Sequence, residues 1–206
     1  KKNATRESTI TSAEYPTHFG ERGDPSGQFS THFGSTGTAS GIASIHFGVN
    51  GIASGEYSTH FGENGDASGP YSTHFGTTGT ASGIASTHFG LDGVVSGTVA
   101  THFGLGGLAD CYGVTVFGRY NVASGCSSIN WVATDPLIIC GNGTTEEVSD
   151  RSNSLVIYKN GNISTIGTIG AGAITGTTLA ATAAGGLELG TDAATNIAGK
   201  IKLWSA

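Results

Sequence analysis

The sequence predicts an all-β protein whose main part is a parallel β-solenoid, also called a β-roll, in which each sequence repeat forms one coil. Three observations lead to this prediction. Seven histidines recur at a constant step of fourteen positions, a phenylalanine follows each of them, and 35 of the 206 residues are glycine. A short fixed period is typical of a repeat architecture. Fourteen residues are too few for a helical hairpin, but they suffice for two short strands and two tight turns.

The repeat reads G-x-x-G-x-A-S-G-x-x-S-T-H-F and occupies residues 15–125, where the last turns become degenerate. Each repeat carries glycine at three places. Glycines are needed where a chain turns with positive φ or where two coils approach closely. The glycine spacing therefore predicts that each repeat is one coil, with turns at the glycines.

Alternation along a strand divides the segment Ser-Thr-His-Phe between two faces, with Thr and Phe on one and Ser and His on the other. Because phenylalanine is large and apolar, we expect its face to be buried and the histidines to lie on the opposite face, at or just under the surface. The small alanines of the second strand, such as Ala39 and Ala53, should point inward. The expected core residues are Phe19, Phe33, Phe47, Phe61, Phe75, Phe89, Phe103 and Phe117.

A coil made from one such short repeat has little interior of its own, so stacked phenylalanines would stay half exposed in a single chain. Burying one phenylalanine side chain contributes roughly 1.5–3 kcal/mol. A ladder of such residues therefore favours association of several chains, and the simplest closed arrangement is a homotrimer around an axis.

The pattern G-x-A-x-G-x-x-S-x-A-h-G, in which h is apolar, is typical of the heads of trimeric autotransporter adhesins of the YadA-like type. The stretch "GTASGIASTHFG" at 79–90 resembles it, with His88 in the usual alanine place and Phe89 in the usual Ile/Leu place. The resemblance covers about residues 17–125. It implies an intertwined homotrimer of left-handed parallel β-rolls that serves as an adhesin head.

The rest of the chain differs in composition. Residues 126–165 predict a β-hairpin connector, with strands at Pro136–Cys140 and Ser154–Lys159 and turns at Asn142-Gly143 and Asn160-Gly161. Residues 166–206 are rich in Gly, Thr and Ala and resemble the trimeric shaft or neck segments of phage and bacterial fibres. Residues 1–14 are polar and predict a lead-in to the first coil.

Composition argues against two classes of partner. The net charge is −6, and no Lys or Arg occurs between Pro25 and Gly118, so we expect no nucleic-acid binding. The chain also lacks an apolar run of about 18 residues, so no membrane span is expected within it. We further expect no cofactor.

The three cysteines, Cys111, Cys126 and Cys140, do not have the count or spacing of a disulfide framework or a zinc site. We expect them to be buried small apolar residues. As an alternative, Cys126 or Cys140 meets its symmetry mates near a trimer axis.

The histidine ladder is the most prominent candidate site. Its members are His18, His32, His46, His60, His74, His88 and His102. Rings about 4.8 Å apart could share a transition metal, but no Asp, Glu or Cys recurs beside them, so a neutral, stacked and hydrogen-bonded ladder is favoured and no metal is expected. Their pKa values should be mostly low, and stability should fall below about pH 5.5–6.

These observations predict a structural and binding protein rather than an enzyme: the head and neck of a trimeric extracellular or cell-surface fibre. Adhesion to an unknown receptor or glycan would use variable coil positions, namely Glu21-Arg22, Val49-Asn50 and Leu91-Asp92. The alternatives are a phage tail fibre or receptor-binding spike on a virion, and a monomeric solenoid with a ligand- or metal-binding His/Phe ladder. A depolymerising enzyme would need paired carboxylates, for which Glu63 and Asp66 are the nearest candidates.

Overall fold

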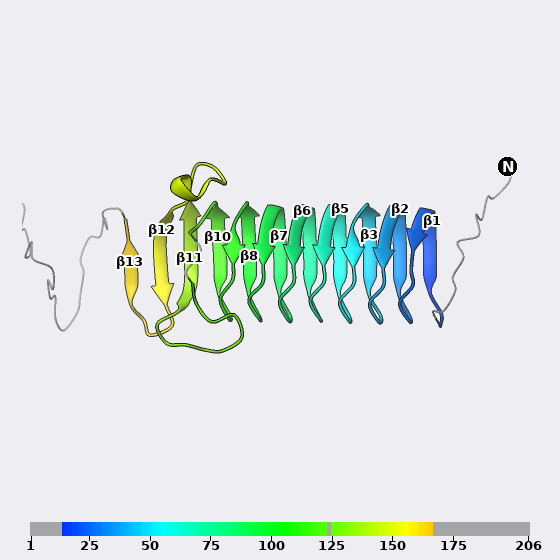
Figure 1. The fold of residues 1–206 in the computed structure, drawn as a ribbon, viewed down its shortest axis with the longest axis horizontal. Coiled ribbons are helices and arrows are strands. Elements are labelled where there is room, and N and C mark those ends of the chain that lie inside the picture. The colour runs from blue at the N-terminus through cyan, green and yellow to red at the C-terminus, as the bar shows by residue number, and fades with distance from the viewer. Residues whose placement is uncertain (1–13, 123–124, 167–206) are drawn as a thin grey trace, which may run out of the picture. The chain divides into compact units, whose positions relative to one another are not determined.

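The computed structural model of the chain describes residues 14–122 and 125–166, and it confirms the all-β parallel solenoid with one coil per sequence repeat. Successive coils stack along one direction as rungs of a single sheet (Figure 1). The coils contain β1 (Thr17–Asp24), β2 (Thr31–Ala39), β3 (Ile45–Val49), β4 (Ile52–Ala53), β5 (Thr59–Ala67), β6 (Thr73–Ala81), β7 (Thr87–Val95), β8 (Thr101–Leu105), β9 (Leu108–Ala109) and β10 (Thr115–Arg119).

The pairing register equals the sequence period. In β2 and β3, His32 pairs with His46 and Phe33 with Phe47, and the same step relates the later parallel pairs as far as β8 and β10. Every side chain of the repeat therefore stands directly above its equivalent in the next coil. The stack consequently sorts the residue types into columns.

Glycine is required at the bend after each phenylalanine. Gly34 has φ +135°, and a β-carbon built there would lie 1.8 Å from the carbonyl oxygen of Gly48 in the next coil. Both the backbone conformation and the close approach of neighbouring coils exclude a side chain at this position. The first glycine of the repeat thus fixes the bend and the spacing of the coils.

The histidines were expected at or just under the surface and instead line the interior of the coil, whereas the half-exposed phenylalanines agree with what was expected of a single chain. The histidines point into the coil and are fully buried from His32 to His102. The residues two places before them, five serines and Ala100, are buried as well, whereas the phenylalanines point outward and are half-buried or exposed. Ala39, Ala53, Ala67 and Ala81 do face inward and have no exposed surface, as predicted. A narrow interior lined by Ala, Ser and Gly admits the smaller imidazole, which leaves the larger phenyl ring outside.

At the C-terminal end, β11 (Pro136–Asn142) pairs in parallel with β10, and β12 (Asn153–Tyr158) and β13 (Ile163–Thr165) add two antiparallel strands. The interior column becomes apolar here, because Val116 and Ile139 follow His102 in register and belong to a hydrophobic cluster with Val114 and Val156. β11 and β12 correspond to the two strands expected at Pro136–Cys140 and Ser154–Lys159. The cluster also includes Val95, Ala100 and Ala109, so the last coils and the added strands share one apolar core.

Only one of the two expected Asn-Gly turns is present. Asn160-Gly161 forms the turn between β12 and β13, with Gly161 at φ +87°. Asn142 instead ends β11, and Gly143 begins a longer loop that contains a short 3-10 helix, η1 (Val148–Asp150). The predicted shaft at 166–206, beyond Ile166, and the lead-in at 1–14, before Glu14, lie outside the described residues.

At the end of the coil stack, the side chain of Asn121 hydrogen-bonds the backbone of the last short strand, β9. Its Nδ2 donates to the carbonyl of Leu108 at 2.9 Å, and its Oδ1 accepts from the backbone N–H of Leu108 at 2.7 Å. Asn121 occupies the next place in the column of Gly93 and Gly107. The amide therefore satisfies the backbone groups that the strand of a further coil would otherwise pair.

Candidate functional site

The histidines form one continuous ladder inside the solenoid. From His32 to His102 the neighbouring rings are nearly parallel, with centroids 4.7–5.1 Å apart, and His18 is tilted by 48° on His32. Each ring packs against a glycine across the coil: a β-carbon at Gly51 would lie 2.1 Å from Cε1 of His60. The second glycine of the repeat therefore provides the space for the imidazole.

The expectation of a hydrogen-bonded ladder is wrong, because the buried rings have no hydrogen bonds of normal geometry to the described part of the chain. Both ring nitrogens of every histidine from His32 to His102 lack a hydrogen-bond partner among the described residues, and so do the hydroxyls of Ser30, Ser44, Ser58, Ser72 and Ser86. A buried polar group without a partner costs about 1–3 kcal/mol, and a buried charge costs more. The arrangement therefore strongly favours neutral imidazoles.

The histidine pKa values shift in the direction expected for such a ladder. Burial, reinforced by the neighbouring histidines, lowers the pKa of His60 to about 3 and that of His88 to about 3. Burial lowers the pKa of His102 to about 4, and burial together with His32 lowers that of His46 to about 4. The pKa values of His32 and His74 are lowered as well, chiefly by burial. Protonation of these histidines should therefore destabilise the folded chain.

The geometry gives little support to a metal shared between neighbouring rings. The lone pair of an imidazole nitrogen lies in the ring plane, so parallel stacked rings aim their lone pairs side by side rather than at a common point. The rings from His32 to His102 also have no exposed surface through which an ion could enter.

The phenylalanines form a second ladder on the outer face. Phe33 and Phe47 have ring centroids 4.6 Å apart, and the column continues to Phe103 and Phe117 at 5.4 Å, with interplanar angles of 10° or less throughout. The rings at the two ends are the most open, with Phe19 59% and Phe117 44% exposed. This ladder is therefore a long apolar strip on the surface of the chain.

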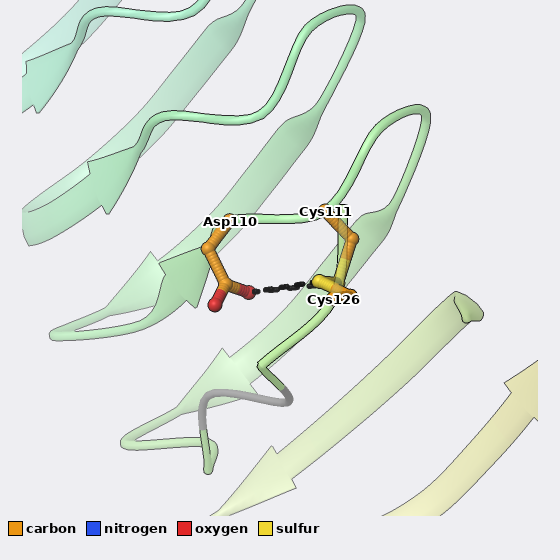
Figure 2. A group of neighbouring side chains, drawn as sticks. All are labelled: Asp110, Cys111 and Cys126. Carbon is orange, nitrogen blue, oxygen red and sulfur yellow. Dashed lines mark hydrogen bonds between the residues drawn. A yellow bond between two sulfur atoms is a disulfide. The ribbon is translucent and has the colours of Figure 1, made fainter. Parts of the chain in front are cut away.

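The prediction for the cysteines needs correction, because Cys111 and Cys126 form a disulfide with their Cα atoms 5.4 Å apart (Figure 2). Their separation of 15 residues is close to one repeat, which places them in adjacent coils. That spacing was the overlooked signal. Oδ1 of Asp110 lies 3.6 Å and 3.8 Å from the two sulfurs, but both sulfurs are bonded to one another and neither is a thiolate that could bind a metal.

The third cysteine extends the phenylalanine column. Cys140 is a free cysteine and pairs in register with Phe117, so it stands one strand beyond the last ring on the same face. It is partly buried. A cross-linker attached to this thiol would therefore report on contacts made by the face that carries the phenylalanines.

The variable positions proposed for adhesion are exposed. Glu21-Arg22, Val49-Asn50 and Leu91-Asp92 all lie at the bend between the two strand segments of a coil. Glu63 is exposed at the same bend, while Asp66 is half-buried and burial raises its pKa. The two carboxylates thus differ in environment.

Sequence reasoning missed one column. The second residue after the third glycine of each repeat lies at a turn, and we call this set the corner column: Tyr15, Phe29, Ala43, Tyr57, Tyr71, Ala85, Val99 and Gly113. All of them have φ between 52° and 64°. Left-handed backbone favours glycine, yet several corners carry large exposed side chains.

No protein-family model matches the chain, and no curated protein matches it in sequence. Within residues 14–122 and 125–166, no helix has the length and apolar character to cross a membrane.

Proposed function

We propose that the chain is the head of a trimeric extracellular fibre, in which three copies pack their phenylalanine ladders around a common axis and the outer bends attach to a surface or receptor. The observation that carries this proposal is the phenylalanine ladder itself. It runs through eight coils on the outside of the chain, and its rings remain half-buried or exposed. Large contiguous apolar surfaces typically mark interaction sites.

The orientation of the rings favours a protein partner. Because the phenyl rings stack on one another, their faces are occupied and only their edges point outward. Such a strip cannot offer ring faces to a small flat ligand. A second copy of the chain carries a strip with the same spacing between coils, so the edges of the two strips can pack in register.

Two further observations support a non-enzymatic, extracellular role. The disulfide between Cys111 and Cys126 is of the kind that persists in oxidising compartments. The histidines from His32 to His102, which are of the usual acid-base type, are fully buried and cannot reach a substrate. The resemblance of the repeat to YadA-like heads also supports an extracellular role. Because those heads are trimers, we propose three copies rather than another number.

Cross-linking at Cys140 tests the proposal, because that thiol stands at the end of the phenylalanine column. A short tris-maleimide should yield covalent trimers, and Cys140→Ser should abolish them. The double variant Phe61→Ser, Phe75→Ser should reduce the trimer yield. Val94→Ser, at an exposed apolar position on the other strand segment, is the matched control and should not. Equal yields from the two variants would contradict the proposal.

A further inference from the structure

The corner column holds one place where two aromatic faces are open toward each other. Phe29 stacks on Tyr15 with centroids 5.7 Å apart, and Tyr57 stacks on Tyr71 at 5.2 Å. Each of these rings uses one face in its stack. The remaining faces of Phe29 and Tyr57 point toward the coil between them, where the corner residue is only Ala43.

The alignment of this column is fixed by the backbone. The N–H of Ala43 donates to the carbonyl of Gln28 at 2.8 Å, and the N–H of Tyr57 donates to that of Ile42 at 2.8 Å. Consecutive corners therefore stand directly above one another. Two coil spacings separate Phe29 from Tyr57, about 9.6 Å in total.

The aromatic corners combine exposed side chains with an unfavourable backbone conformation. Phe29 and Tyr57 are 52% and 50% exposed, and both adopt a left-handed φ, at 58° and 56°. Gly113 occupies the equivalent place in a later coil, so glycine fits this corner without strain. Bulky residues in left-handed backbone cost about 1 kcal/mol or more each, and such strain is concentrated at functional positions.

We propose that the gap at Ala43 is a carbohydrate-binding slot that sandwiches one pyranose ring between Phe29 and Tyr57. This deepens the attachment function proposed above by naming its ligand class, and it rests on that function for its biological role. A saturated six-membered ring needs about 4 Å to the aromatic carbons on each side plus its own pucker, about 8–9 Å in all. A flat aromatic ring needs only about 7 Å and would leave the slot loose.

The rim of the slot matches the polar edge of a sugar. Glu56, next to Tyr57, is exposed, whereas the Nε2 of Gln28, next to Phe29, donates to Oε2 of Glu14 in the preceding coil at 2.7 Å and so faces away from the slot. The hydroxyl of Tyr57 adds a further donor and acceptor. The Glu56 carboxylate and the Tyr57 hydroxyl can hydrogen-bond the equatorial hydroxyls of a pyranose while the aromatic faces contact its C–H groups. Ile42, 45% exposed, borders the slot on its apolar side.

The chain contains a matched control. Residues 37–44 and 79–86 both read GTASGIAS, so Ala43 and Ala85 have the same local sequence. Ala85 lies between Tyr71 and Val99, and therefore has an aromatic neighbour on one side only. A tyrosine is tolerated at this corner, because Tyr57 and Tyr71 adopt φ values of 56° and 60° there.

The test is saturation-transfer NMR on the full chain with methyl glucosides, galactosides, mannosides and N-acetylglucosaminides as probes. At least one probe should receive saturation from the protein. Ala43→Tyr should abolish that transfer, Phe29→Ala should weaken binding about fivefold, and Ala85→Tyr should leave it unchanged. The absence of transfer to every pyranoside, its survival in Ala43→Tyr, equal loss in Ala85→Tyr, or stronger binding of adenine would overturn the slot. Light scattering on the same samples reports the oligomeric state separately, so failure of the slot is distinguished from failure of the fibre.

Discussion

A β-carbon at Gly65 would lie 2.2 Å from Cε1 of His74, across the interior of the coil. Gly65 is not among the residues with positive φ, so glycine is required there for space rather than for backbone conformation. The imidazole of His74 is fully buried against it. The glycine and the histidine thus act as a pair that sets the width of the coil.

Substituting Gly65→Ala should therefore destabilise the protein by about 1–3 kcal/mol, because the methyl group overlaps the ring. His74→Ala in the same chain should recover part of that loss, since it removes the overlapping ring. Urea unfolding of the two single variants and the double variant gives the coupling energy. Gly113→Ala, where φ is +64° and no atom lies within 4 Å of the added methyl, measures the cost of a left-handed backbone in the absence of overlap and serves as a comparison. Additive effects of Gly65→Ala and His74→Ala would contradict the pairing.

Stability should fall as the pH is lowered through the window between the unfolded and folded pKa values of the histidines. The unfolded value is 6.5, and the folded values for His46, His60, His88 and His102 are about 3 to 4. Between these limits the unfolded chain binds more protons, so the stabilisation is complete above about pH 6.5 and is lost progressively toward pH 4. At pH 5 each of the four histidines lowers the unfolding free energy by about 2 kcal/mol.

Thermal melts at pH 8, 6, 5 and 4.5 measure this dependence. A melting temperature that stays constant across the series would contradict the neutral buried ladder. The variant His60→Gln keeps a polar side chain that does not titrate in this range, so its melting temperature should depend less steeply on pH. The difference between the two slopes of melting temperature against pH gives the contribution of His60, apart from that of the acidic residues on the surface.

The disulfide predicts the number of free thiols. Under denaturing conditions without reductant, each chain should titrate one thiol, from Cys140, and after reduction it should titrate three. Reduction should also lower the unfolding free energy by about 3 kcal/mol, because the bridge closes a loop of about 15 residues. Cys140→Ser should leave no titratable thiol before reduction. Three thiols in the unreduced chain would contradict the assigned pairing.

The repeat period allowed the coils and their stacking to be predicted, because both follow from the constant step between equivalent residues. The inward alanines were predicted from their small size. The inside and outside of the Ser-Thr-His-Phe strand could not be assigned by alternation, which is equally consistent with either choice. Phenylalanine was placed inside on its apolar character alone. The decisive constraint is the width of a coil lined by Ala39, Ser44 and Gly37, and the second glycine column was the signal for it.

The corner column was missed for a different reason. Turns with positive φ predict glycine, so tyrosine and phenylalanine at such a turn give no recognisable sequence signal. Only the backbone conformation of Phe29 and Tyr57 shows that large side chains are held there at a cost. The disulfide escaped prediction because cysteine spacing was compared with known frameworks rather than with the repeat length.

The mass of the native protein tests the fibre proposal most directly. Light scattering after size exclusion at neutral pH should give about three times the chain mass of 20.6 kDa, because the phenylalanine ladders are then buried against one another. The Phe61→Ser, Phe75→Ser variant should shift that mass toward the single chain. A native protein of 20.6 kDa would contradict the trimer and leave the phenylalanine ladder as an exposed face of a single-chain solenoid.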